Sequence, residues 1–316
     1  MTEYRRSRLI LDVDTGVDDA LAIALALRHP RVQLEAVISV AGNVNVELTT
    51  RNTLRVLDWL GASHIPVARG AAHPLSGPVR QASHWHGPDG LGGAGLPESS
   101  RRAMDDGVGY LVERVSAEPG ELTLVCTAPL TNLALAVQRR PRIVDEVRDV
   151  VLMGGAARPP GNVTPVAEFN IYADPDAAAI VFQQPWRITM VGLDVTNRVP
   201  LTRHEREAIA RATSPEAVLV REVTRHLFDA RGVDAMALHD PLAVGVVIQP
   251  ELVTTLHREV RVETRGDLTF GQTVVDLRSN ANAAGSNTRV CMKVDAEHFK
   301  TLFFETLDIT PSRAPV

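Results

Sequence analysis

Leu9-Ile-Leu-Asp-Val-Asp-Thr-Gly-Val-Asp-Asp-Ala20 is the stretch that decides the fold, because an apolar strand changes there into a helix across a Thr-Gly turn. The branched apolar residues at its start predict a buried strand, and the residues after Ala20 continue as an apolar helix. In open α/β sheets, ligands bind beyond the carboxyl ends of the strands, so Asp14, Asp18 and Asp19 stand where an active site is expected. Their mutual repulsion predicts a hard metal ion among them.

Helix capping is the simpler explanation for one or two of these acids, since a carboxylate near a helix N-terminus is stabilised by the helix dipole. Four aspartates within eight residues exceed what capping needs, which favours metal or substrate binding. Asp12 faces back into the strand end. We therefore expect it to orient a metal ligand rather than to be one.

Strand-like and helix-like segments alternate, which is the order of a parallel sheet covered by helices. The expected strands are 9–13, 34–40, 122–126, 150–153 and 188–193, and the expected helices are 20–27, 48–60, 130–137, 177–182, 240–248 and 296–307. Residues 201–230 look helical, and 260–294 should give two or three strands. We expect an open, mostly parallel α/β sheet flanked by helices, in one domain over residues 1–316, because no change of composition marks a linker.

Composition excludes several classes of partner. The net charge is −5 and no basic run occurs, so nucleic acid and anionic membranes are not expected partners, whereas a small neutral or cationic ligand is. Cys126 and Cys291 lie in apolar runs that suit reduced, buried thiols. Neither a signal peptide nor a membrane span is apparent, so the cytoplasm is the expected compartment.

Ala237-Leu-His-Asp-Pro241 places a histidine and an aspartate at the start of an apolar helix. An aspartate before proline is often only an N-cap. Together with the N-terminal acids, however, Asp240 supplies a further oxygen ligand, and His239 becomes an acid or a polar contact beside it. The segment from His84 to Gly92 resembles a mobile lid, in which His86 is the more probable functional histidine.

Two further segments offer polar groups. Glu168-Phe169-Asn170, after a Gly-Pro loop that contains Asn162, carries groups suited to a polyhydroxylated ligand, although Asx-turn chemistry is an alternative for Asn162 and is favoured for Asp174. Gly42-Asn43 could be only a turn after a strand. Thr127 follows the strand 122–126, where its carbonyl can face a metal, and capping is the plainer role for the adjacent Thr131 or Asn132.

These segments together resemble the inosine-uridine preferring nucleoside hydrolase family over nearly the whole chain. The family's Asp-x-Asp-x-Gly-x-Asp-Asp-Ala signature is similar to Asp12–Ala20, and the other matching motifs are Ala41-Gly-Asn43, Thr127–Asn132, Met153-Gly-Gly155, Ala167-Glu-Phe-Asn170 and His239-Asp-Pro241. Several motifs in the same order make a coincidence implausible. The resemblance implies a Rossmann-like nucleoside hydrolase fold.

The resemblance also implies a mechanism: hydrolysis of the N-glycosidic bond of ribonucleosides to free base and ribose. Asp14 would be the general base that takes a proton from a calcium-bound water. The implied Ca²⁺ ligands are Asp14, Asp19, Asp240 and the Thr127 carbonyl, completed by water and two ribose hydroxyls. The implied ribose contacts are Asp18, Asn162, Glu168 and Asn170, with Asn43, Met153, Phe169 and Asp240 also expected to meet the substrate. His239 and His86 would serve the leaving base.

Some features depart from the family. Thr15 replaces a common proline, and the helix before His239 offers only Phe228 where many relatives place tyrosines. His86 favours a pyrimidine or mixed base preference, while Trp85 keeps stacking on purines possible. The family further implies nucleoside salvage and a homodimer or homotetramer.

Two rivals come from other classes. An aspartyl-nucleophile phosphatase would share the Asp12-Val-Asp14 motif but needs a lysine before a later acidic motif, and the only lysines are Lys293 and Lys300. A catalytically silent nucleoside-binding protein on the same scaffold is the other alternative.

Overall fold

The computed structural model describes residues 6–209, 212–278, 286 and 288–309, and its centre is an eight-stranded sheet of order β3-β2-β1-β4-β5-β6-β12-β9. Seven neighbouring strands run parallel, and β9 pairs antiparallel with β12 at one edge. The strands are β1 (Ser7–Val13), β2 (Val32–Ser39), β3 (Val67–Arg69), β4 (Leu122–Cys126), β5 (Asp149–Met153), β6 (Ile188–Val191), β9 (Val253–His257) and β12 (Thr288–Val294). The predicted open, mostly parallel α/β sheet is confirmed.

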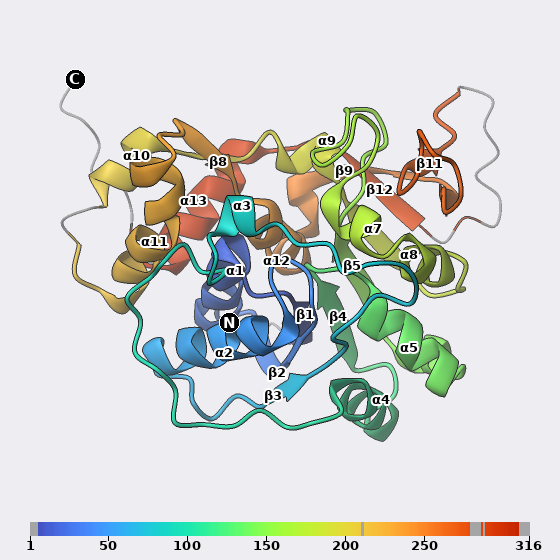
Figure 1. The fold of residues 1–316 in the computed structure, drawn as a ribbon, viewed down its shortest axis with the longest axis horizontal. Coiled ribbons are helices and arrows are strands. Elements are labelled where there is room, and N and C mark those ends of the chain that lie inside the picture. The colour runs from blue at the N-terminus through green and yellow to red at the C-terminus, as the bar shows by residue number, and fades with distance from the viewer. Residues whose placement is uncertain (1–5, 210–211, 279–285, 287, 310–316) are drawn as a thin grey trace, which may run out of the picture.

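Helices cover both faces of the sheet, as Figure 1 shows. One face packs against α1 (Val17–Arg28), α2 (Val46–Trp59), α11 (Pro215–Arg225), α12 (His239–Ile248) and α13 (Ala296–Thr306). The other face packs against α4 (Gly107–Ala117), α5 (Thr131–Arg139) and α8 (Pro175–Phe182). The sheet therefore separates two hydrophobic clusters.

The alternation within β1 explains why its sequence is apolar without interruption. Leu9 and Leu11 enter the cluster on the α12 face, and Ile10 enters the cluster on the opposite face. A parallel strand that is buried on both faces needs apolar residues at every position. Helix α1 is buried all round because it packs between the sheet, α11 and α12.

Shorter elements complete the described chain. They are α3 (Ser83–His86), α6 (Ile143–Glu146), α7 (Phe169–Ala173), α9 (Leu193–Thr196), β7 (Pro200–Thr202), α10 (Arg203–Ala208), η1 (His226–Ala230), β8 (Ala235–Ala237), η2 (Pro250–Leu252), β10 (Val260–Val262) and β11 (Thr273–Val275). The described residues between 260 and 294 thus form three strands, in agreement with the expected two or three. The helical prediction for 201–230 holds for three separate pieces, and its residues 210–211 lie outside the described chain.

The sequence did not predict β3, β9 or α4. Both strands lie in the outer part of the sheet, and β3 has only three residues, too few for a periodic pattern. Among the residues that the structure describes, no helix combines the length and the apolar character needed to cross a bilayer.

The prediction that Thr131 or Asn132 caps a helix is wrong. Helix α5 begins after Leu130, and no side chain caps it. The Thr131 hydroxyl donates instead to Asp174 Oδ2 at 2.7 Å, and Asn132 Nδ2 donates to Asp12 Oδ1 at 2.6 Å. Both side chains turn away from their own helix toward buried carboxylates on other segments. A buried carboxylate without a hydrogen-bond donor costs more free energy than a helix end without a side-chain cap.

Candidate active site

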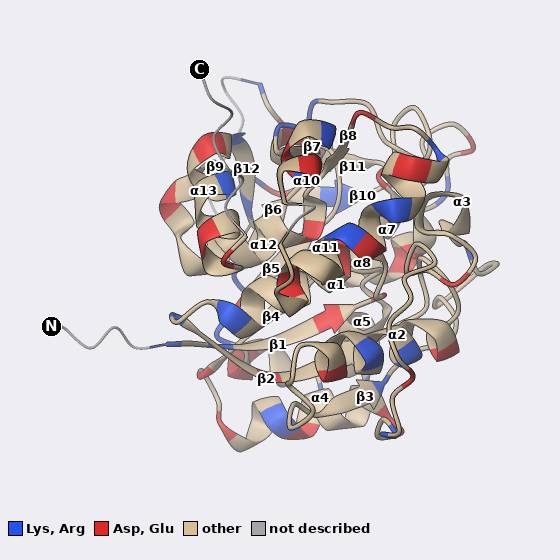
Figure 2. Ribbon diagram, turned by 90° about the vertical axis from the view of Figure 1, so that its left-hand side faces the viewer, with Lys and Arg blue, Asp and Glu red and all other residues tan. Residues whose placement is uncertain are grey.

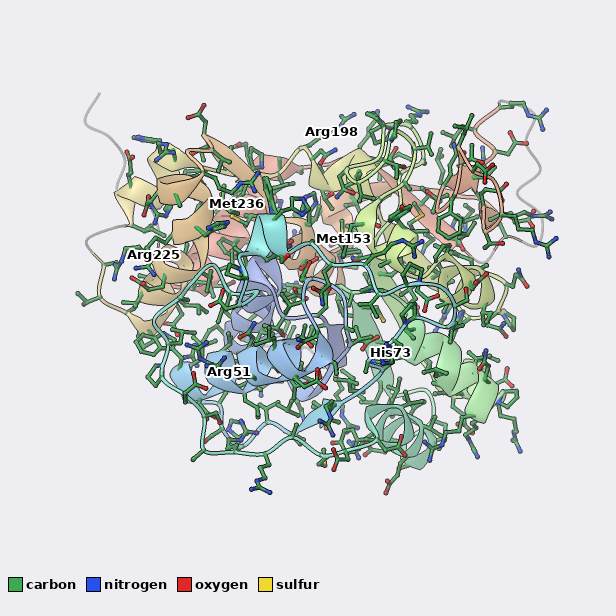
Figure 3. The ribbon with its side chains drawn as sticks, in the orientation of Figure 1. Arg51, His73, Met153, Arg198, Arg225 and Met236 are labelled. Atoms are coloured by element: carbon green, nitrogen blue, oxygen red, sulfur yellow. The ribbon has the colours of Figure 1, made fainter. Side chains whose placement is uncertain are left out.

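A cavity of about 460 Å³ lies beyond the carboxyl ends of β1, β4 and β5. Its walls come from strand-end residues, from the loops before α3 and α7, and from the start of α12. The lining residues are Asp14, Asp18, Asn43, Ala82, His84, Trp85, His86, Thr127, Met153, Asn162, Val163, Glu168, Phe169, Asn170, Asn197, Ala235, Met236, Ala237, His239 and Asp240. In Figure 3, Met153 and Met236 appear on either side of α3. Every residue that the sequence predicted for the site lines this cavity except Asp19.

Asn43 holds the carboxylate of Asp14. Its backbone N–H donates to Asp14 Oδ2 at 2.8 Å, and its side-chain amide donates to Asp14 Oδ1 at 3.0 Å. Gly42 makes this approach possible, because a Cβ at that position would lie 2.0 Å from Asp14 Oδ2. The end of β2 therefore fixes the orientation of a carboxylate that the end of β1 supplies.

Asp19 lies beneath the cavity and joins three segments. Its Oδ2 accepts a hydrogen bond from Gly16 N at 2.8 Å, and its Oδ1 accepts one from the Thr127 hydroxyl at 2.8 Å. Gly16 is needed here because a Cβ would lie 2.4 Å from His86 Nδ1. The sequence suggested only the carbonyl of Thr127, so the contact made by its hydroxyl was missed.

Asp18, Asp19 and Asp240 bring carboxylate oxygens within 4.8 Å of one another. Asp14 lies close to the same group, because Asn43 Nδ2 is 3.0 Å from Asp14 Oδ1 and 3.3 Å from Asp19 Oδ2. Helix α12 begins at His239, so Asp240 lies in its first turn and is not its N-cap. Asp18 Oδ1 is buried without a hydrogen-bond partner among the described residues.

Burial and mutual repulsion change the acidity of this cluster. Burial, followed by the charge of Asp19, raises the pKa of Asp18 to about 7. Burial and neighbouring carboxylates also raise the pKa of Asp14 and of Asp240 well above the usual range, and burial raises that of Asp19. An all-oxygen, negatively charged set with an unsatisfied buried oxygen suits a hard cation.

Asp12 lies behind the cluster in β1 and does not line the cavity. Its Oδ1 accepts a hydrogen bond from Asn132, whose amide also donates to the Ser39 carbonyl at 3.2 Å. Burial raises the pKa of Asp12 to about 7. Asn132 thus links Asp12 to the end of β2. Among the described residues, the Asp12 side chain bonds none of the predicted metal ligands, so its role in orienting one stays a prediction.

The loop around α7 supplies the far wall. The Glu168 carboxylate is the N-cap of α7, where it accepts backbone N–H bonds from Asn170 at 2.9 Å and from Ile171 at 3.2 Å, and it accepts a further one from Gly155 at 2.9 Å. The Asn170 amide nitrogen donates to the carbonyls of Thr127 at 2.9 Å and Met153 at 3.1 Å. The carbonyl oxygen of Asn170 remains available for a ligand.

Asn162 makes no Asx turn. Its Oδ1 accepts a hydrogen bond from Phe169 N, seven residues further along, at 2.9 Å, which leaves its NH₂ group available for the cavity. Asp174 has a structural role, but as the N-cap of α8 through a 3.1 Å bond from Ala177 N rather than as the Asx turn that the sequence favoured.

Two histidines, the buried His86 and the part-buried His239, also line the cavity. The Val17 N–H donates to His86 Nδ1 at 3.1 Å, so the His86 proton must be on Nε2 when the ring is neutral. His239 Nδ1 is 2.8 Å from the Thr196 hydroxyl. Burial lowers the pKa of His86 to about 3 and that of His239 to about 4. Both imidazoles are therefore neutral near pH 7.

The aromatic surface of the cavity comes from Trp85 and Phe169, not from Phe228. Phe228 is buried in η1, and its ring packs against the guanidinium groups of Arg203 at 5.6 Å and Arg206 at 5.4 Å. Cation–π contacts with these two guanidinium groups stabilise the ring in the protein interior. Phe228 therefore does not reach the cavity and cannot contact the substrate.

The lining residues that the sequence did not predict for the site include Asn197 and Met236. Asn197 follows α9, which directly follows β6, so the strand-end rule applied to β6 would have found it. Met236 lies in β8, a three-residue strand paired only with β7. No sequence pattern identifies such a residue.

A carboxylate cluster at the carboxyl edge of a parallel sheet, next to a cavity with amide and imidazole groups, defines an α/β enzyme of small polar substrates. The family model described as "Inosine-uridine preferring nucleoside hydrolase" matches residues 9–301, and the chain belongs to this family. It is a hydrolase that acts on N-glycosyl compounds, with a nucleoside as substrate.

Named relatives and solved structures agree on the family. The chain is 40% identical over 307 residues to an inosine-uridine preferring nucleoside hydrolase of Leishmania major, covering 95% of this chain and 97% of the relative. It is 40% identical to the pyrimidine-specific ribonucleoside hydrolase RihA of Salmonella newport, over 95% and 97% of the two chains. A purine-preferring ribonucleoside hydrolase from Gardnerella vaginalis has a similar structure, with a TM-score of 0.89, 35% identity and coverage of 95% and 98%.

Proposed function

We propose that this enzyme hydrolyses the N-glycosidic bond of ribonucleosides with Ca²⁺ as cofactor and Asp14 as general base. The observation that carries the proposal is the buried cluster of Asp14, Asp18, Asp19 and Asp240. Among the residues that the structure describes, no arginine or lysine lines the cavity, so a bound cation would be the source of positive charge there. A cluster made only of oxygen donors favours calcium over zinc.

The calcium ligands would be carboxylates of Asp14, Asp19 and Asp240 together with the Thr127 carbonyl. That carbonyl already accepts one hydrogen bond from Asn170, and its second lone pair is free. When bound, calcium would make a water molecule more acidic and bind ribose hydroxyls. The unpartnered Asp18 oxygen is then available to accept a hydrogen bond from the sugar.

Asp14 takes a proton from the attacking water, which adds to C1′ as the bond to the base breaks. Two hydrogen bonds from Asn43 keep its carboxylate in one orientation, so that little reorganisation is needed when the proton moves. General base catalysis of this kind contributes about 10²- to 10⁴-fold in rate.

Ribose is held by Asp18, Asn162, Glu168 and Asn170, with Asn43 and Met153 beside it. The NH₂ group of Asn162 and the side-chain carbonyl oxygen of Asn170 are not used in the hydrogen bonds within the protein described above, so both can bind ribose hydroxyls. These groups favour a flattened, positively charged sugar near the transition state, as in other glycoside cleavages.

The leaving base lies near His86 and His239. Because Val17 fixes the tautomer of His86, the Nε2–H group of His86 can donate a hydrogen bond to a base oxygen or nitrogen. A carbonyl of a pyrimidine is a suitable acceptor, which supports a pyrimidine or mixed preference. The relatives' names include inosine-uridine, pyrimidine and purine preferences, so base preference is a property of this cavity rather than of the family.

The decisive test is reducing-sugar release from inosine, uridine, cytidine and adenosine, before and after chelation and with calcium added back. We expect release that chelation abolishes and calcium restores, with uridine or cytidine among the good substrates. Activity that survives complete chelation would refute the calcium requirement. No release from any substrate by calcium-loaded protein would favour the silent binding protein, and phosphate release from a phosphate monoester would favour the phosphatase.

We also propose that residues 1–316 form a single catalytic domain that assembles into a homodimer or homotetramer. The proposal comes from the family resemblance. Sedimentation equilibrium at micromolar concentration tests it, and a uniform mass near 34.3 kDa would contradict it.

A further inference from the structure

A second cavity, of about 420 Å³, lies at the amino ends of the parallel strands, whereas the active site lies at their carboxyl ends. Its lining includes Ser7 and Asp149, the first residues of β1 and β5, Arg289 near the start of β12, and the end of α12. The cavity therefore lies where the parallel strands begin. Figure 2 shows this separation: β1 starts on the side of the N-terminus, and α3, at the active site, lies on the other side. The proposed hydrolysis uses none of the residues of this cavity.

Two threonine hydroxyls line the inner wall of the cavity. Thr123 and Thr189 are 5% and 4% exposed, yet neither side chain has a hydrogen-bond partner among the described residues. The strand alternation explains their direction, because their second neighbours Val125 and Val191 belong to the hydrophobic cluster on the α12 face. A nearly buried hydroxyl without a partner can bind a polar ligand.

Three arginines surround a single aspartate at the same cavity. Asp149 lies 3.3 Å from Arg187, 3.6 Å from Arg289 and 3.9 Å from Arg148, measured between carboxylate oxygens and guanidinium nitrogens. Asp149 is the one carboxylate that pairs with these arginines among the described residues, so the group carries about two unneutralised positive charges. The carbonyl end of α12 adds only about half a negative charge.

We propose that this cavity binds the phosphate group of a small phosphorylated metabolite or of free phosphate. Guanidinium groups bind phosphate oxygens through charge-assisted hydrogen bonds, and the threonine hydroxyls supply further donors. Val151, Val247 and Pro250 form an apolar wall that can contact the organic part of a phosphate monoester. The volume is within the range of small-molecule sites and close to that of the active site.

The test is calorimetric titration of the full-length protein, loaded with calcium and then freed of excess calcium by gel filtration. The probes are inorganic phosphate, glycerol 3-phosphate and, as a neutral control, glycerol. We expect both phosphates to bind with dissociation constants below about 1 mM at low salt, and more weakly as salt rises. Tighter binding of the ester would mean that the apolar wall contributes, and equal binding would mean that the site recognises phosphate alone.

Variants connect the binding to this cavity. Arg289→Gln should weaken binding at least tenfold, and Thr189→Val should weaken it about two- to tenfold. The matched control is Arg261→Gln, an exposed arginine in β10 that pairs with Glu259 outside the cavity. Nucleoside hydrolysis should be unchanged in all three variants, because none of these residues belongs to the active site.

The proposal is overturned if neither phosphate binds the wild-type protein at concentrations up to about 10 mM. It is also overturned if Arg289→Gln and Thr189→Val both bind phosphate as wild type does. Because binding is measured without nucleoside, this result can be read even if the protein releases no ribose. If Arg289→Gln does not fold, Thr189→Val alone decides, since valine has nearly the same shape as threonine.

Discussion

Replacement of Asp14 by asparagine separates catalysis from folding more sharply than any other change in the chain. The structure gives the asparagine a defined position: its carbonyl oxygen can still accept the 2.8 Å bond from Asn43 N, and only the 3.0 Å bond that Asn43 Nδ2 donates to Asp14 Oδ1 is lost. The fold should therefore survive. The base, however, is lost together with one proposed calcium ligand.

The expected loss in kcat is at least 10²- to 10⁴-fold, the usual contribution of a general base, which corresponds to about 3–5 kcal/mol of transition-state stabilisation. Stability should change in the opposite direction. In the chelated protein, Asp14 is one of four close carboxylates, and its neutralisation removes repulsion on the order of 1–3 kcal/mol. We therefore expect the melting temperature of the chelated variant to rise by several degrees.

Two measurements check both effects on the same samples: reducing-sugar release with calcium present, and thermal unfolding with and without a chelator. The matched control is Asp145→Asn, an exposed aspartate in α6 that does not line the cavity. Turnover of Asp14→Asn within tenfold of wild type would refute its role as base. A lower melting temperature of the chelated variant would show that the four carboxylates do not destabilise the metal-free fold.

Four other perturbations have defined outcomes. Gly42→Ala places a Cβ 2.0 Å from Asp14 Oδ2 and should cut ribose release more than 100-fold in a folded protein, checked by circular dichroism; near-normal activity would contradict this. Asp174→Ala removes the α8 cap and two more hydrogen bonds and should lower the free energy of unfolding by about 2–4 kcal/mol in urea titrations, and a loss below 0.5 kcal/mol would argue against the cap. Calcium at 100 times its dissociation constant should stabilise the protein by about 2.7 kcal/mol. Because the raised pKa of Asp18 is about 7, the chelated protein should lose stability as pH rises from about 4 to 7, and the opposite slope would contradict the repulsion.

The structure of the site explains why membership of the family does not determine which nucleobase the enzyme prefers. The groups around ribose and calcium come from strand ends that the sheet holds in fixed register. The base side is built from α3, β8 and the residue after α9, which are short elements with few ladder contacts. Substrate preference can therefore change in these segments while the carboxylate cluster remains intact.

The sequence alone determined the sheet class and the main acidic residues. Apolar strands that alternate with apolar helices are compatible with few folds other than a parallel sheet covered by helices. The local order of strand, turn and helix places Asp14, Asp18 and Asp19 at one strand end. The motif with Asp240 could be found because it stands at a helix start with a proline. These features depend on neighbours in the chain, which the sequence shows directly.

Only the tertiary structure decided what each side chain contacts. Asn132 turns from its own helix to Asp12, Glu168 is occupied by backbone N–H groups, and Phe228 lies in the interior between arginines. The second cavity, lined by Arg148, Arg187 and Arg289, also brings together residues from strands that are far apart in the sequence. Such contacts depend on burial and on hydrogen-bond partners brought together by folding, and no local pattern records which buried group will find which donor.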